Sequence, residues 1–216
     1  MIYLKKKILP QVFGWMFLGL LITFISAYIV SINTNMLIKI YSGGFYWVFV
    51  IAELILAGVL SIRIGKMKGI TATCLYLFYT FLTGLTLSLI FVAYEMSSII
   101  IVFLVTALLF GIFALIGKFT KIDLSKFGTY LFMGLIGILI LYLINIFIAN
   151  DTINIIGCIL GIIIFLGYVA FDIQRILKSE GTLENRNLAI IGAFSLYLDF
   201  INIFIDLLNL FGNSKD

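Results

Sequence analysis

The 216-residue chain contains no histidine, one proline, two cysteines and few charged residues. Without histidine it lacks the commonest metal ligand and the commonest general base of enzymes. With a single proline, any helix bends must come from glycine or from inserted polar groups. Cys74 and Cys158 stand inside apolar runs, so we expect small buried side chains rather than a disulfide framework or a metal site. These absences argue against a metalloenzyme and against a histidine-dependent hydrolase.

Apolar residues dominate what is present. They make up 63% of the chain, charged residues make up only 11%, and the mean hydropathy is +1.25. Soluble domains carry about 25% charged residues, and a membrane helix needs about 20 apolar residues. We therefore predict an all-α integral membrane protein with a single membrane domain over residues 1–216. Its seven transmembrane helices are expected at roughly 11–32, 44–64, 70–93, 97–117, 127–149, 153–177 and 187–211.

The basic residues predict the orientation in the membrane. Twelve of the 14 fall at the N-terminus or in alternate loops, whereas Lys39 and Lys215 lie on the other side. Cytoplasmic loops carry the excess of lysine and arginine, so the N-terminus is expected inside and the C-terminus outside. If the last, more polar span re-enters the membrane instead of crossing it, the C-terminus would lie inside. The net charge of +4 is spread over several loops and does not indicate nucleic-acid binding.

Two aspartates, Asp172 and Asp199, lie within the last two apolar spans. A charge at membrane depth is costly and is a functional-site hypothesis by default. With the connecting loop centred near residue 183, their distances from the turn differ by about five residues, or about 7 Å of helix. We expect the carboxyl groups to meet, share a proton and sense pH, because two carboxylates in one dry site cannot both ionise cheaply. In the alternative interpretation, Asp172 reaches the inner interface and pairs with Arg175.

The last span also carries a polar stripe with helical spacing. A lipid-facing stripe would be unsatisfied, so these side chains must face protein or water. The stripe predicts an ion or proton pathway, although its outermost member is also explained by water at the helix end. The residues are Ser195, Asp199, Asn202, Asp206 and Asn209.

The second span contributes two further candidates. Glu53, near its middle, is either a cation ligand or partner of the aspartates, or an isolated protonated carboxyl bonded to a neighbouring helix. Arg63, at its inner end, is level with Asp172 and could serve as a movable counter-ion. Arginines at the inner interface are also common topological anchors, so both interpretations of Arg63 stay open.

Four blocks of sequence resemble the Bax inhibitor-1 family, in the order and spacing of that family over residues 10–212. The two most specific are G-Y-V-A-F-D-I-Q-R-I at 167–176 and S-L-Y-L-D-F-I-N-I-F-I-D-L-L at 195–208. Weaker matches are Y-T-F-L-T-G-L-T-L-S at 79–88 and K-I-D-L-S-K-F-G at 121–128.

This resemblance implies a seven-helix fold whose central last helix is wrapped by the other six. It also implies a pH-sensitive calcium leak gated by an aspartate pair, here Asp172 and Asp199, with Arg63 as the arginine that latches onto the pair. Glu53 matches an acidic residue of the family's second helix. The chain departs from bacterial relatives at Asn209, where a basic residue is frequent.

We therefore expect a membrane cation channel and no enzyme. Hard cations such as Ca²⁺ prefer carboxylate and carbonyl oxygens, and Ca²⁺ is expected at Asp172 and Asp199 as bound or transported ion, with no other cofactor. The expected partners are the lipid bilayer, Ca²⁺ and protons, and the expected location is a bacterial plasma membrane.

Three other functions are alternatives to a channel. A proton-coupled exchanger would use the same acidic residues. An intramembrane aspartyl protease would require a G-x-G-D turn, but Leu196, Tyr197 and Leu198 precede Asp199. A non-conducting scaffold would leave the polar stripe unexplained.

Overall fold

A computed structural model describes residues 8–181 and 185–215 of the chain. Within these residues, seven helical segments are long and apolar enough to cross a membrane, and no strand is present. This confirms the predicted all-α membrane protein and places each span within a few residues of its predicted bounds. The observed spans are Ile8–Ser31, Phe45–Lys66, Gly69–Ala93, Met96–Phe119, Leu124–Ile148, Asp151–Lys178 and Arg186–Phe211.

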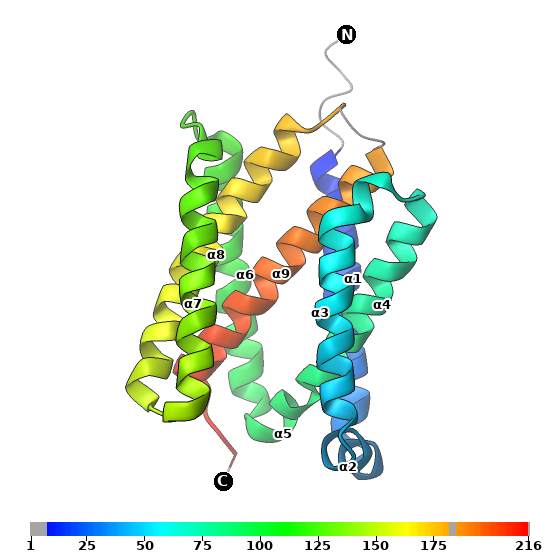
Figure 1. Cartoon of the computed structure of the whole chain (residues 1–216), viewed down its shortest axis with the longest axis vertical. Helices are drawn as coiled ribbons and strands as arrows, with labels where there is room; N and C mark the ends of the chain where they lie inside the picture. Colours follow the sequence, from blue (N-terminus) through cyan, green and yellow to red (C-terminus); the bar gives the residue numbers. More distant parts are fainter. Residues whose placement is uncertain (1–7, 182–184, 216) are drawn as a thin grey trace. The chain divides into compact units, whose positions relative to one another are not determined.

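The long helices are coloured along the chain in Figure 1. They are α1 (Ile8–Ser31), α3 (Phe45–Arg63), α4 (Gly69–Thr86), α6 (Met96–Phe119), α7 (Gly128–Ile148), α8 (Asp151–Lys178) and α9 (Asn185–Phe211). Short helical segments complete the order: α2 (Thr34–Ser42), η1 (Ile64–Lys66), η2 (Leu87–Leu89), α5 (Ile90–Ala93) and η3 (Leu124–Phe127). The third span, Gly69–Ala93, is not one continuous α-helix. Helix α4 ends at Thr86, and η2 and α5 form the rest of the span.

The first compact unit contains the described residues of 1–95, 179–197 and 214–216. Helices α1 and α4 lie side by side in it, and α3 packs on α4 (Figure 1). The contact of α1 with α4 is close because Gly84 has no side chain: a Cβ there would lie 1.8 Å from Ser26 Oγ. Deep in this unit, the Thr23 hydroxyl lies 2.6 Å from the Tyr197 hydroxyl and 2.8 Å from the Thr80 carbonyl oxygen. The Tyr197 hydroxyl of α9 is therefore satisfied inside protein.

The second compact unit contains residues 96–178 and 198–213. Helix α8 packs against both α6 and α7 (Figure 1). Gly117 of α6 touches the backbone of Ala170 of α8, since a Cβ on Gly117 would lie 2.3 Å from the Ala170 carbonyl oxygen. The second half of α9 packs in this unit through Phe200, whose ring contacts Phe103 and Phe110 edge-on.

Burial differs greatly between the spans. In the most apolar window of α9, 72% of residues are buried, against 6% in the windows of the α3 and α7 spans. Large apolar side chains on those two helices are open, and Phe147 is 88% exposed. Such a surface is stable in lipid but not in water. Helix α9 is thus the most buried span; its enclosure by the other six helices and the single domain stay predictions.

Candidate functional site

The aspartate pair lies inside the second unit. Asp172 on α8 and Asp199 on α9 are 4% and 5% exposed. Their carboxyl groups are close enough to repel each other. The structure therefore brings together the two residues that counting along the sequence placed at similar depth. Their role in pH sensing and Ca²⁺ binding stays a prediction.

Arg175 is the arginine that the structure places at this pair. Its Nη2 lies 3.1 Å from Asp172 Oδ1, one turn away on α8, and its guanidinium also attracts Asp199. The arginine side chain is 46% exposed and lies over the ring of Phe171. The same-turn ion pair considered from the sequence is present, but Asp172 is buried and does not sit at the surface. Arg175 therefore lies between the buried carboxyl pair and the exposed surface of the second unit.

Asp199 is less fully satisfied. Among the described residues, none provides a hydrogen-bond partner for its buried Oδ2 atom. A buried carboxylate oxygen without a donor costs free energy. A proton or a cation would remove this cost, so Asp199 is chemically suited to take up either.

Arg63 belongs to the first unit, whereas the aspartate pair belongs to the second. It is exposed at the C-terminal end of α3 in the first unit. There it lines an open cleft of about 420 Å³ together with Ile62, Lys66 and Met67. Its proposed role as a latch for the aspartates stays a prediction.

Asp206 has a site of its own in the second unit. It is buried, and its Oδ1 accepts a hydrogen bond of 2.8 Å from the Tyr142 hydroxyl of α7. The Cys158 sulfur of α8 lies 3.8 Å from the same hydroxyl. A Cβ on Gly161 would lie 2.1 Å from Asp206 Oδ2, so only glycine leaves room for this carboxyl. The sequence analysis did not predict that Tyr142, Cys158 and Gly161 surround Asp206. A tyrosine inside an apolar span, away from the interfacial belt, was the available signal.

The remaining members of the stripe differ in their surroundings. Ser195 and Asn202 are half-buried, and Asn209 is exposed at the helix end, as water contact would require. The Asn202 amide donates to the Leu198 carbonyl of its own helix at 2.8 Å. The buried acidic positions Asp199 and Asp206 are therefore the strongest pathway candidates on α9.

Glu53 lies in the first unit, half-buried on α3. Its Oε1 accepts a 2.8 Å hydrogen bond from the Thr86 hydroxyl at the end of α4, and Tyr79 of α4 is also close. This contact matches the expectation of a carboxyl bonded to a neighbouring helix. It also puts the carboxyl at the interruption of the third span.

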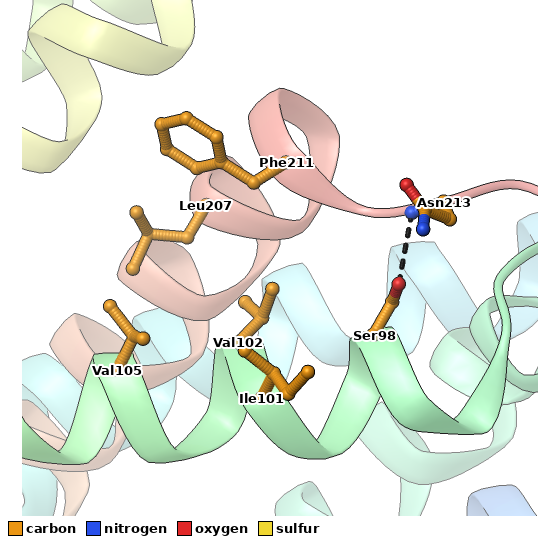
Figure 2. A pocket seen from close by; sticks show the side chains of 7 residues that line it. All are labelled: Ser98, Ile101, Val102, Val105, Leu207, Phe211 and Asn213. Atoms are coloured by element: carbon orange, nitrogen blue, oxygen red, sulfur yellow. Dashed lines mark hydrogen bonds between the residues drawn. The ribbon is translucent and has the colours of Figure 1, made fainter.

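In the part of the chain that the structure describes, no three cysteine, aspartate or glutamate side chains gather closely enough to hold a metal ion. Two carboxylates alone would need further oxygen ligands for Ca²⁺. A groove of about 330 Å³ between α6 and α9 does not supply them, because its lining is apolar with a polar rim (Figure 2). At the rim the Asn213 backbone N–H donates to Ser98 Oγ at 3.1 Å.

The C-terminal end of α8 is fixed to the loop before α7. The Gln174 side chain accepts from the Leu124 N–H at 2.9 Å and donates to the Ile122 carbonyl at 2.8 Å. Lys178 donates to Asp123, and this hydrogen bond is the main reason that the pKa of Asp123 falls to about 2. The segment that carries Arg175 is therefore held at its aqueous end.

Comparison with known proteins gives a consistent result. Residues 5–216 match the family described as "Inhibitor of apoptosis-promoting Bax1". The inner membrane protein YbhL of Escherichia coli K12 is 39% identical over 96% of this chain and 92% of its own length. An uncharacterized protein of Borreliella burgdorferi is 38% identical over 100% of this chain and 95% of its own length. An uncharacterized membrane protein of Streptococcus pyogenes serotype M1 is 37% identical over 78% of this chain and 75% of its own length.

Proposed function

Because this chain belongs to the Bax inhibitor-1 family, we propose that it is a pH-sensitive cation leak of a bacterial plasma membrane, with Ca²⁺ as the transported ion. In this proposal the N-terminus and the lysine-rich and arginine-rich loops face the cytoplasm, and the C-terminus lies outside. The bacterial sources of the relatives and the inner-membrane name of one of them support this location.

The observation that carries the proposal is the buried pair of Asp172 and Asp199. When both are ionised, two buried negative charges lie beside the guanidinium of Arg175. The excess charge favours a proton or a cation in the site, since an uncompensated buried charge is expensive. The same carboxyl groups can therefore respond to pH and attract the permeant ion.

Gating follows from competition between an arginine and a proton. While both aspartates are ionised, an arginine holds the pair and keeps the pathway closed. Mild acid protonates the pair, weakens that hold and shifts the population towards an open state. Stronger acid also removes carboxylate ligands for Ca²⁺, so flux should peak at intermediate pH. Arg175 makes this contact in the structure, whereas the resemblance points to Arg63.

We further propose a transport protein without cofactor and without enzymatic activity. The sequence around Asp199 lacks the G-x-G-D turn of aspartyl proteases, and the only proline is Pro10. The buried acidic residues then serve ions rather than a peptide bond.

The test is Ca²⁺ flux into liposomes that contain the pure protein, measured between about pH 5 and 8. Asp172→Asn and Asp199→Asn should each flatten the pH profile, and the double variant should add little, because the carboxyl groups act as one unit. Asp151→Asn, which changes an exposed carboxyl on α8, is the matched control and should keep the wild-type profile. Independent, additive effects of the two changes would contradict the proposal.

The same liposomes distinguish a leak from a proton-coupled exchanger. A leak continues when the proton gradient is collapsed, whereas an exchanger loses its driving force. Replacing each arginine separately identifies the latch: the basal leak should rise with Arg175→Gln or with Arg63→Gln, according to which one holds the pair. An unchanged leak in both variants would reject the arginine latch.

A further inference from the structure

The interruption of the third span gathers backbone oxygens inside the first unit. Helix α4 ends at Thr86, and the Leu87 N–H turns back to the carbonyls of Leu85 and Thr83 to start η2. The last carbonyls of a helix have no partners in the next turn, and the macrodipole makes that end partially negative. Broken membrane helices use such carbonyls to coordinate cations in transporters. The end of α4 is therefore a suitable place for a cation, provided that side-chain ligands are also present.

Two hydroxyl groups converge on these carbonyls. The Tyr41 hydroxyl, from α2, lies 2.9 Å from the Thr86 carbonyl oxygen and 3.3 Å from that of Leu85. It also lies 3.1 Å from Ser88 Oγ, and the Ser88 hydroxyl donates to the Leu85 carbonyl at 2.7 Å. Ser88 is fully buried. Because each hydroxyl oxygen keeps lone pairs after donating its hydrogen, both can still act as ligands.

A carboxylate completes the oxygen cluster from the neighbouring helix. Glu53 Oε1 lies 2.8 Å from the Thr86 hydroxyl, and that hydroxyl also lies 3.0 Å from the Thr83 carbonyl. Among the described residues, the groups that act on Glu53 electrostatically or by hydrogen bonds include no lysine or arginine. The negative charge of Glu53 is therefore balanced by polar groups alone.

Hydrogen atoms are scarce in this cluster. Three hydroxyl hydrogens, those of Tyr41, Thr86 and Ser88, face the carbonyls of three residues and one carboxylate. The Leu87 N–H also points to the Thr83 and Leu85 carbonyls, but the one hydrogen of the Thr86 hydroxyl is shared between Glu53 and the Thr83 carbonyl. A cation would supply the positive charge that this carboxylate lacks. Carboxylate, hydroxyl and carbonyl oxygens are the ligand set of hard cations such as Ca²⁺.

We propose that this cluster is a second cation site, which takes a hard divalent cation with Glu53 as its charged ligand. The inference rests on the proposed function, because it treats Ca²⁺ as the ion that enters the protein. The site belongs to the first unit and shares no residue with the aspartate pair of the second. The neutral ligands are the hydroxyl groups of Tyr41, Thr86 and Ser88 and the carbonyl groups of Leu85 and Thr86.

The experiment uses the full chain in detergent with Asp172→Asn and Asp199→Asn, so that the aspartate pair is removed. Tb³⁺ is titrated as a Ca²⁺ substitute with excitation through tyrosine, because Tyr41 would sit beside the bound ion and sensitise its emission. Emission should saturate and be displaced by Ca²⁺. Adding Glu53→Gln should weaken binding about tenfold or more, since affinity follows the number of charged ligands. Glu95→Gln, which changes an exposed carboxyl of the same unit, should have no effect.

Ser88→Ala provides a variant that leaves the charge and the helices intact. It should weaken Tb³⁺ binding by about threefold through loss of one neutral ligand. Wild-type affinity in either Glu53→Gln or Ser88→Ala would overturn the site. Ca²⁺ flux in liposomes separates the two proposals: flux without this Tb³⁺ site rejects only the site, and Tb³⁺ binding without flux rejects only the leak.

Discussion

Replacing Gly117 by alanine tests whether the close contact of α6 with α8 positions the aspartate pair. A Cβ on Gly117 would lie 2.3 Å from the carbonyl oxygen of Ala170 and 2.7 Å from its Cα. Both are backbone atoms, which cannot rotate away as a side chain can. Helix α8 must therefore move by about 1 Å or more to restore ordinary contact distances. Asp172 follows Ala170 by two positions, so it must move with the helix.

The expected cost follows from the size of this clash. Overpacking a tight contact costs about 1–3 kcal/mol. For a chain of about this length, 1 kcal/mol corresponds to about 2–4 °C, so the midpoint of thermal unfolding should fall by about 2–12 °C. The pH profile of Ca²⁺ flux should also change, because the distance between the two carboxyl groups sets their interaction.

Gly111→Ala is the matched control on the same helix. A Cβ at Gly111 meets nothing within 4 Å, and alanine favours helix over glycine by about 1 kcal/mol. This variant should be as stable as the parent or more stable. Both midpoints are measured by tryptophan fluorescence in the same detergent. If Gly117→Ala unfolds at the same temperature as Gly111→Ala, the packing argument is wrong.

Three further predictions concern single polar contacts. Tyr142→Phe removes the hydroxyl that donates to Asp206 and should lower the unfolding free energy by about 1–3 kcal/mol, measured by thermal unfolding; an unchanged midpoint would deny the contact. Asp123→Asn should destabilise the protein at neutral pH, because the lowered pKa means that its bond to Lys178 stabilises the fold above about pH 4. That difference from wild type should shrink as the pH falls from about 4 towards 2, and a constant gap would contradict it. Arg175→Gln should raise the basal Ca²⁺ leak, because it removes the positive charge beside the buried Asp172 carboxylate; a loss of stability without extra leak would mean that Arg175 has a purely structural role.

The spans could be predicted because long apolar runs with charged loops leave few alternatives to a membrane helix. The proximity of Asp172 and Asp199 also followed from the sequence, since both are counted from one short loop and the helix rise is fixed. These are local properties of the chain. They need no knowledge of which helices are neighbours.

The surroundings of Asp206 and Glu53 could not be predicted in this way. Tyr142 meets Asp206 across a separation of 64 residues, through tertiary packing that sequence spacing does not specify. The end of α4 at Thr86 has no proline to mark it, and the third span continues in apolar residues. The turn is stabilised by tertiary contacts, among them those of Tyr41 and Ser88 with its carbonyl groups.

The heavy burial of α9 also bears on how the protein is made. This helix leaves the ribosome after the other six spans, and it carries Asp199 and Asp206 within its apolar length. Each aspartate at the centre of an isolated helix costs about 3 kcal/mol on insertion into lipid. Tyr142 of α7 precedes α9 in the chain, and in the folded protein its hydroxyl donates to Asp206, so this contact offsets part of the cost. Integration of the last helix is therefore coupled to the helices that were synthesised before it.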